Sequence, residues 1–340
     1  MKRENTACPA EKFKTMIGGQ ALIEGIMMRG PEKQAVVVRN VKEGLIEKVE
    51  PLKKKTGFYT WPLVRGVVNF GGSMISGVKS LMWSAENSGM EDEEGGTEEP
   101  SKFEQWLEKK LGSEKFMSVV VTISVILGLG FSILLFFLLP MLLGNLFQRL
   151  TGCGVVVQHL IEGLLRIVIF FAYMIGVSKL KDMKRVFSYH GAEHKTIRCY
   201  EAKLPLTVEN VRPMTRLHPR CGTSFLFVVM ALSIFLFTIL SAVLNSLIPG
   251  LAALRDQSRI LYNLLMMGIK LVIMLPLVVS ISYEINRFVG RHDNAFTRIL
   301  TAPGMWFQNF TTNEPDDSMI EVAIRALELV LPEQEGADKW

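Results

Sequence analysis

The sequence is poor in cysteine and histidine, and both shortages narrow the class of protein. Four cysteines (positions 8, 153, 199 and 221) are scattered through 340 residues without a C-x-x-C pair, so no disulfide framework is indicated. The polar first residues, MKRENTACPAEKFKTM, contain no apolar core, and we expect no cleaved secretory signal. Three of the five histidines fall between residues 188 and 225, which directs attention to that stretch.

Charge is missing from two long stretches of the chain. Residues 116–148 and 224–250 contain no Asp, Glu, Lys or Arg, in a sequence that is 49% hydrophobic. Residues 155–178 and 260–284 are also apolar, although they include charged residues such as Arg166 and Lys270. A helix of about 20 apolar residues is long enough to cross a bilayer. We therefore predict an α-helical membrane protein with four transmembrane helices, at 116–148, 155–178, 224–250 and 260–284.

Basic residues are unevenly divided among the connections between these helices. Residues 179–223 contain ten Lys or Arg, whereas the connection between the first two helices contains only Arg149. In the connection between the last two helices, Arg255 and Arg259 are offset by Asp256. Because cytoplasmic connections are enriched in Lys and Arg, four spans with both termini in the cytoplasm fit this distribution and two spans do not. The expected location is the cell (inner) membrane, with the histidine-rich stretch on its cytoplasmic side.

Within that stretch, His190-x-x-Glu193-His194 has the H-x-x-E-H form found in inverted zinc peptidases. His190 and His194 are one helical turn apart and share a face, and imidazole nitrogen is a preferred ligand of zinc. Glu193 is the candidate general base. A second cluster, with His218 and Cys221, supplies the further ligands that a tetrahedral site needs.

One more carboxylate is a candidate ligand. Glu284 ends the fourth predicted span, at the level of the histidine-rich stretch. An ion pair with Arg287, one turn further on, is an equally good interpretation of this residue.

The remaining segments surround the predicted spans. Residues 1–60 form a cytoplasmic N-terminal β unit, in which 34–41 and 45–49 read as a hairpin joined by Lys42-Glu43-Gly44. Residues 61–86 read as an interfacial amphipathic helix, 87–115 as an acidic linker with a short helix, and 179–223 as a cytoplasmic His/Cys loop. In the cytoplasmic C-terminal segment, 285–340, we predict an amphipathic helix at 316–331 with a Ser318–Glu321 capping box. We expect this helix to dock on the β unit or on the loop.

Four motifs carry a resemblance to a bacterial family, the YqhQ-like proteins (domain of unknown function 1385). They are GGQALIEGIMMRGP at 18–31, YHGAEHKTI at 189–197, HPRCGTSF at 218–225 and PGMWFQNFTTNEPDDSMIEVAI at 303–324. The family is described as membrane proteins and predicted metal-dependent enzymes, without an established reaction. The resemblance implies metal-site residues at His190, Glu193, His194, His218 and Cys221.

Three functions are compatible with these patterns. The first is a metal-dependent hydrolase that binds a divalent ion, most simply zinc, with one position left to water. The second is a scaffold in which a structural metal fills all four positions, and the third is a transporter component that uses the intramembrane charges. The expected partners are the lipid bilayer, anionic lipid headgroups and a protein partner or second copy, with no nucleic acid. The ten basic residues favour an anionic substrate, although membrane topology alone also explains them.

Overall fold

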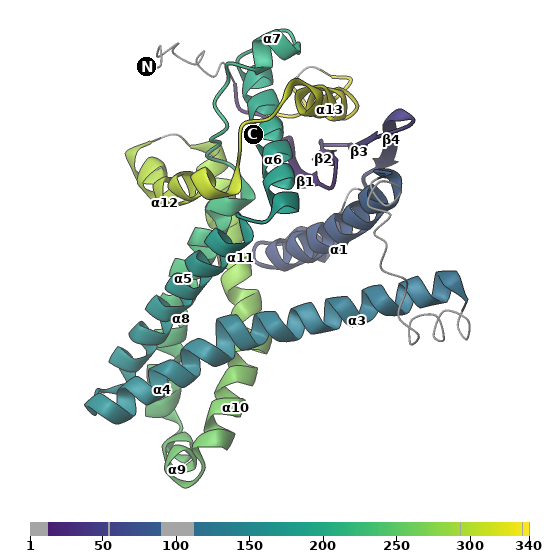
Figure 1. The fold of residues 1–340 in the computed structure, drawn as a ribbon. Helices are drawn as coiled ribbons and strands as arrows, with labels where there is room; N and C mark the ends of the chain where they lie inside the picture. The colour runs from purple at the N-terminus through teal and green to yellow at the C-terminus, as the bar shows by residue number, and fades with distance from the viewer. Residues whose placement is uncertain (1–12, 54, 90–111, 293, 335, 340) are drawn as a thin grey trace, which may run out of the picture. The chain divides into compact units, whose positions relative to one another are not determined.

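The computed structural model describes residues 13–53, 55–89, 112–292, 294–334 and 336–339 (Figure 1). The chain divides into two compact units. The first consists of Met1–Glu91, Tyr173–Leu236 and Gly268–Trp340, and the second of Asp92–Ala172 and Phe237–Met267. All the residues predicted to form the metal site fall in the first unit.

A four-stranded antiparallel sheet begins the first unit. Its strands, β1 (Gly18–Leu22), β2 (Gly25–Arg29), β3 (Lys33–Asn40) and β4 (Gly44–Pro51), lie in sequence order. The predicted hairpin is confirmed as β3–β4. Its turn is stabilised by the Asn40 side chain, which accepts hydrogen bonds from the backbone of Lys42 and Glu43, and Gly44 adopts the positive φ that glycine allows.

The residues from Gly18 to Arg29 form a first hairpin, β1–β2, whose turn the sequence pattern did not predict. Its two strands are joined by Ile23 and Glu24, and Glu24 has a φ of 51°. The buried Glu24 carboxylate accepts hydrogen bonds from Arg185 and from the Tyr189 hydroxyl. These partners lie far along the chain, so tertiary contacts hold the turn in place.

The inner strands β2 and β3 are covered on both faces, whereas β4 is largely exposed. On one face, Met27, Val36 and Val38 pack with Trp83 of helix α1 (Val64–Asn87). On the other, a larger core joins the sheet to α6 (Lys181–Glu201) and α13 (Asp317–Glu328), through residues that include Ile26, Met28, Val37, Tyr189, Ala192, Ile320, Ala323 and Leu327. The first unit is therefore a layer of sheet between α1 and the α6–α13 pair (Figure 1).

The segments around this layer differ in detail from the sequence prediction. The connection between the second and third predicted spans contains the 21-residue helix α6, on which His190 and His194 lie as their spacing predicted, and the short α7 (Val208–Val211). Helix α12 (Ala295–Thr311) precedes α13, which docks on both the sheet and α6 as expected. The helix α13 is capped by Asp316, whose side chain accepts from Met319 N, two residues before the predicted cap at Ser318.

Helix α1 corresponds to the predicted amphipathic helix at 61–86, and it follows a short 3-10 turn, η1 (Gly57–Thr60). It packs against α11 (Leu275–Arg291). A Cβ on Gly66 would lie 2.7 Å from Ser280 Cα, which shows how closely the two helices approach. The predicted acidic linker at 87–115 lies largely outside the described residues.

Among the described residues, three helices are long and apolar enough to cross a membrane: Thr122–Thr151, Val155–Val177 and Ile260–Arg291. A shorter apolar stretch, Phe225–Leu240, lies within α8 (Gly222–Leu247), where the third span was predicted. The first candidate span comprises α3 (Ser113–Ile133), a π-helical turn η3 (Leu134–Leu138) and α4 (Leu139–Thr151). The second is α5 (Val155–Val177). Helices α9 (Pro249–Gln257) and α10 (Arg259–Ile269) lead through a second π turn, η4 (Lys270–Met274), into α11. Lys270, in η4, is buried.

Candidate metal centre

Helix α6 presents two histidines toward the sheet. His190 and His194 stand on consecutive turns, with their ring centroids 4.4 Å apart in an edge-to-face arrangement. The helix is buried on nearly all sides in this region, because the sheet covers one face and α13 another. His194 is only 1% exposed, while His190 is half-buried. The spacing that predicted a shared helical face is therefore confirmed.

Backbone carbonyls fix the orientation of both rings. His190 Nδ1 lies 2.8 Å from the carbonyl oxygen of Thr311, and His194 Nδ1 lies 2.6 Å from that of Arg216. Because a carbonyl oxygen can only accept, each Nδ1 carries the proton and donates it. Each Nε2 then keeps its lone pair. In metal-binding histidines, a hydrogen bond of this kind fixes the tautomer and the ring orientation, so that the other nitrogen faces the metal.

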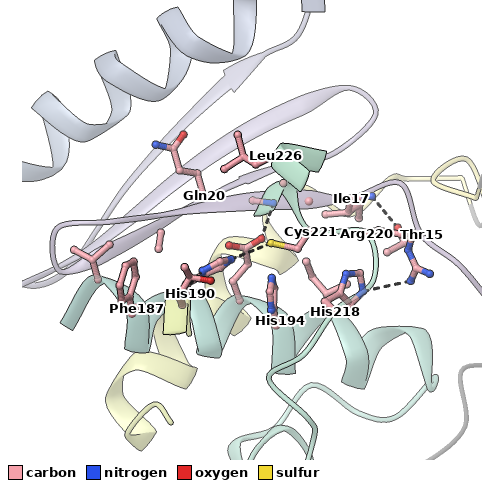
Figure 2. A pocket seen from close by; sticks show the side chains of 18 of the residues that line it. Thr15, Ile17, Gln20, Phe187, His190, His194, His218, Arg220, Cys221 and Leu226 are labelled. Carbon is pink, nitrogen blue, oxygen red and sulfur yellow. Dashed lines mark hydrogen bonds between the residues drawn. The ribbon is translucent and has the colours of Figure 1, made fainter. Parts of the chain in front are cut away.

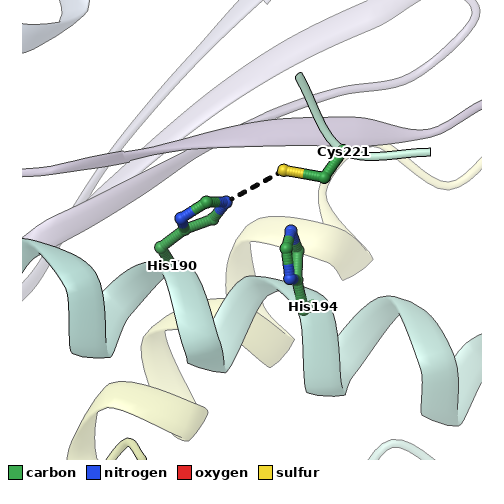
Figure 3. A group of neighbouring side chains, drawn as sticks. All are labelled: His190, His194 and Cys221. Carbon is green, nitrogen blue, oxygen red and sulfur yellow. Dashed lines mark hydrogen bonds between the residues drawn. The ribbon is translucent and has the colours of Figure 1, made fainter. Parts of the chain in front are cut away.

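Cys221 completes a group of three metal-ligating side chains (Figure 3). Its Sγ lies 3.2 Å from His190 Nε2, and one ligand atom from each of His190, His194 and Cys221 lies within 4.8 Å of the others. The cysteine stands just before α8, in a turn where its N–H donates to the carbonyl of His218. The site therefore combines three segments that are distant in sequence: α6, the turn before α8 that holds Cys221, and α12, whose Thr311 carbonyl bonds to His190.

The residues fit a zinc ion. Tetrahedral zinc, with Zn–N of about 2.0–2.1 Å and Zn–S of about 2.3 Å, places its ligand atoms roughly 3.3–3.6 Å apart. In the structure, His190 Nε2 and Cys221 Sγ are 3.2 Å apart and the three donor atoms all lie within 4.8 Å of one another, so small shifts bring them to that spacing. His194 Nε2 is buried and has no hydrogen-bond partner, which is a costly condition for a polar atom unless it has a ligand. Burial lowers the pKa of His194 to about 4, so at neutral pH its imidazole is in the uncharged form that binds metals.

Glu193 lies between the two histidines in sequence and lines the same cavity as they do. Its Oε1 accepts a hydrogen bond of 3.0 Å from the backbone N–H of Gly19 in β1. Its Oε2 is buried without a hydrogen-bond partner. Burial raises the pKa of the Glu193 carboxyl to about 7, which is the range in which a carboxylate exchanges protons at neutral pH.

His218 lies beside this group but has other partners. Its ring centroid is 5.6 Å from that of His194, while its Nε2 lies 3.3 Å from both Glu201 Oε2 and Arg220 Nη2. Gln308 holds the backbone on either side, accepting from His218 N and donating to His218 O. Burial, and then the cations Arg220 and Arg198, lower the pKa of His218 well below its usual value. The structure therefore assigns His218 to a buried polar cluster next to the three-ligand group.

Glu284 is not brought into the group either. Its two carboxylate oxygens face the guanidinium of Arg65 on α1, at 2.7 Å and 2.5 Å. Tyr283 beside it accepts a hydrogen bond from Asn69. These contacts attach α1 to α11. Glu284 thus pairs with Arg65 instead of Arg287 or a metal, and no sequence pattern links residues so far apart.

The group opens onto a cavity of about 400 Å³ (Figure 2). His190, His194 and Cys221 line it together with Glu193, and Arg220 lies on its wall. Apolar side chains, including Ile17, Phe187 and Leu226, form other parts of the lining. An unfilled fourth position on a bound metal would therefore face a space large enough for a small ligand.

Several residues that shape the site were not expected from the sequence. The two carbonyls that orient the histidines belong to Thr311 and Arg216, and no side-chain pattern reveals a backbone acceptor. The pair Gly18–Gly19 did carry a signal. A Cβ on Gly19 would lie 2.6 Å from Met27 O and 3.0 Å from the Glu193 carboxyl carbon, so glycine is needed for the strand to approach Glu193. Buried Glu201 also escaped notice, because acidic residues near the end of a polar helix are ordinarily solvated.

A helical protein with membrane-length spans and a His/His/Cys group beside a buried glutamate is the class that this fold and site define. Within it, the family model of DUF1385, a protein family of unknown function, matches residues 61–333, and the chain belongs to this family. The chain is also 31% identical to the uncharacterized protein YqhQ of Bacillus subtilis (strain 168) over 331 residues, which cover 94% of this chain and 93% of that protein. No solved structure matches the chain significantly.

Proposed function

We propose that this chain is a metal-dependent hydrolase of the cell membrane, with its centre at the cytoplasmic face. The observation that carries the proposal is the preparation of two histidines for the same ligand: both donate Nδ1–H to backbone carbonyls, and both share a site with Cys221. Two nitrogens and one sulfur suit zinc, and three protein ligands are the number found in catalytic zinc sites.

The division of labour follows from the surroundings of each side chain. His190, His194 and Cys221 would hold the ion, which would supply an activated water and polarise the bond to be cleaved. Glu193 would accept the proton of that water through Oε2, the oxygen that no protein group uses. The Gly19 N–H holds the other oxygen and so keeps the carboxylate aimed at the cavity.

A structural role for the metal receives less support from the geometry. A closed site would need a fourth protein ligand, and the sequence offered His218 for it. The Nε2 of His218 instead lies with Glu201 and Arg220. The scaffold hypothesis therefore requires this cluster to rearrange, whereas the hydrolase hypothesis uses it as it stands.

The hydrolase is tested with protein purified in detergent, loaded with zinc and assayed on p-nitrophenyl acetate and bis-p-nitrophenyl phosphate. We expect Glu193→Gln to keep its zinc and to lose about 10²–10⁴-fold in rate, as is usual when a general base is removed. The matched control is Glu321→Gln, on the exposed face of α13. Equal rates for wild type and Glu193→Gln would refute the assignment of the base. Zinc-loaded protein without any hydrolysis would favour the structural metal.

The membrane topology belongs to the same proposal. Three candidate spans and the apolar stretch of α8 would together give four crossings, with both termini and the metal centre in the cytoplasm. Single cysteines introduced near residues 151 and 255, in a background without native cysteines, should react with an impermeant maleimide added outside the cell. A cysteine near residue 205 should not react. Labelling at 205 would reverse the orientation and move the centre to the outer face.

A further inference from the structure

The cavity beside the metal group has a mixed lining. It includes the side chains of His190, His194 and Cys221 and the unsatisfied oxygen of Glu193. Apolar side chains line other parts of the cavity, and they include Phe187 of α6 and Ile17 just before β1. Figure 2 shows Phe187 and His190 projecting from the same helix into this space. A ligand that matches both kinds of lining has a polar reactive group joined to an apolar portion.

Two lining residues come from apolar helices of membrane character. Met174 belongs to the candidate span Val155–Val177, three residues before its end, and Leu226 is the second residue of the apolar stretch Phe225–Leu240. The end of one such helix and the beginning of another therefore contribute to the same cavity wall. In a bilayer, these helix ends lie where the hydrocarbon region meets the headgroups. A cavity for a purely water-soluble substrate has no need of walls of this origin.

The size of the cavity limits how much of a ligand it holds. At about 400 Å³ it lies near the lower end of the roughly 300–1,000 Å³ typical of small-molecule sites. It can hold a reactive headgroup and the adjoining part of one chain, but not a whole two-chain lipid. Leu226 is 39% exposed, and Tyr173, next to Met174, is 41% exposed, so apolar surface continues outward from the cavity wall. The remainder of a chain would lie along that surface.

We infer that the substrate is a lipid: an amphiphile whose cleavable bond lies beside an apolar chain, bound with the chain against Phe187, Met174 and Leu226. The inference rests on the proposed hydrolase function and names its substrate class. The bond would be presented to the metal group from the membrane side of the cavity.

The inference is tested by photolabelling the full-length protein in phosphatidylcholine vesicles with palmitic acid that carries a diazirine in its chain. Mass spectrometry then locates the labelled residues. We expect labels on cavity residues such as Phe187 and Leu226, in addition to the general lipid-facing surface. Leu226→Trp should fill the cavity and lower the labelling of Phe187 about tenfold, which corresponds to about 1.4 kcal/mol of binding free energy.

Two further variants make the result decisive. Val168→Trp places the same ring on an exposed face of α5 and should leave the labelling of Phe187 unchanged. Leu226→Ala opens the wall instead of filling it and should keep the cavity labelled, which guards against misfolding of the tryptophan variant. Labels confined to outward-facing residues such as Val168, or equal labelling of Phe187 in wild type and Leu226→Trp, would overturn the inference.

The labelling experiment and the hydrolase assay fail separately. Palmitate binding needs no metal, so a labelled cavity in a protein that never hydrolyses an ester would leave the lipid site standing and remove the hydrolase. Conversely, hydrolysis of p-nitrophenyl acetate that depends on Glu193, without labelling of the cavity, would keep the hydrolase and overturn the lipid as its substrate. A small water-soluble substrate would then be the conclusion.

Discussion

The chain contains two H-x-x-E pairs, and they have become different structures. In the second unit, His159 and Glu162 lie on α5, and His159 Nδ1 is 3.3 Å from Glu162 Oε2. In the first unit, His190 and Glu193 have the same spacing on α6, yet the carboxylate bonds to Gly19 and the imidazole to Thr311. Identical spacing on a helix therefore gives a self-contained pair in one place and a divided set of ligands in the other.

The partners contributed by neighbouring elements account for the difference. Around Glu162, Gln158 donates from the same helix at 3.2 Å and also bonds to Asn145 of α4 at 2.9 Å. Arg166, one turn further on, donates to the carbonyl of Phe136, which lies in the π turn η3. An amide engages Glu162 and a backbone carbonyl engages Arg166, whereas both ring nitrogens of His159 are buried without a hydrogen-bond partner. In the α6 set, backbone carbonyls instead bond to Nδ1 of each histidine, and Cys221 lies in the same group of metal-ligating side chains.

The contrast bears on the transporter hypothesis. A pathway for ions needs charged groups that can exchange partners across the membrane. Gln158 instead joins Glu162 to Asn145 of α4, and Arg166 is engaged with the Phe136 carbonyl, an arrangement that suits a tether between the first two candidate spans. The described contacts therefore support a structural role for the α5 set and a chemical role for the α6 set.

The largest effect should separate the two histidine sets by metal content. His190→Ala, His194→Ala and Cys221→Ser each remove one of three ligands and should lower bound zinc more than about tenfold, because each ligand contributes strongly to the affinity. His159→Ala should retain the zinc of wild type. Inductively coupled plasma mass spectrometry on protein purified without chelators measures both. Loss of zinc from His159→Ala together with its retention in His194→Ala would reverse the comparison.

The part of this site that the sequence predicted is the part set by local spacing. His190 and His194 share a face because they are four residues apart on a helix, and the choice of zinc follows from the ligand types. Cys221 was named with His218, and only the cysteine joined the group. The Nε2 of His218 lies with Glu201 and Arg220 instead of the three-ligand group. No local sequence pattern predicts that contact.

The fold shows the same division between local and tertiary information. The β3–β4 hairpin was predicted, because its turn is specified by Asn40 and Gly44 themselves. The β1–β2 turn was not, because Glu24 owes its position to Arg185 and Tyr189 on α6. Helix α6 carries His190 and His194 on one face as their spacing predicted, but its length was not predicted, because its polar sequence lacks the apolar stripe of a surface helix.

A smaller effect, on stability, should come from alanine substitutions at two glycines, one beside Glu193 and one beside Glu162. A Cβ on Gly19 would lie 2.6 Å from Met27 O and 3.0 Å from Glu193, while a Cβ on Gly144 would lie 2.5 Å from Glu162 Cγ. Alanine at either position overpacks a close approach and should cost about 1–3 kcal/mol of unfolding free energy. Thermal unfolding in detergent measures this cost.

The two glycine variants should differ in function although they are similar in stability. Gly19→Ala displaces the N–H that holds Glu193 and should also lower the hydrolysis rate per bound zinc. Gly144→Ala should leave that rate unchanged, since the Glu162 set has no part in the reaction. If Gly144→Ala lowered the rate and Gly19→Ala did not, the chemical role would have to move to the α5 set.

The smallest effect concerns Glu284, which the sequence offered as a ligand. Glu284→Gln breaks a partly exposed ion pair with Arg65 and should cost about 0.5–1 kcal/mol of stability, because solvent screens such pairs. Its zinc content should equal that of wild type. The control is Glu333→Gln, whose ion pair with Lys33 is longer and more exposed, and which should cost less still. A loss of zinc in Glu284→Gln alone would restore this residue as a ligand.

Zinc K-edge X-ray absorption on the purified protein is the most direct test of a zinc centre at His190, His194 and Cys221. We predict one zinc per chain, with two nitrogen ligands at about 2.0–2.1 Å, one sulfur ligand at about 2.3 Å and one oxygen ligand from water. Cys221→Ser should remove the sulfur contribution, and Cys199→Ser, at a buried cysteine outside the group, should leave it unchanged. A zinc shell without sulfur in the wild-type protein, or a protein that binds no zinc at all, would contradict the His190–His194–Cys221 centre.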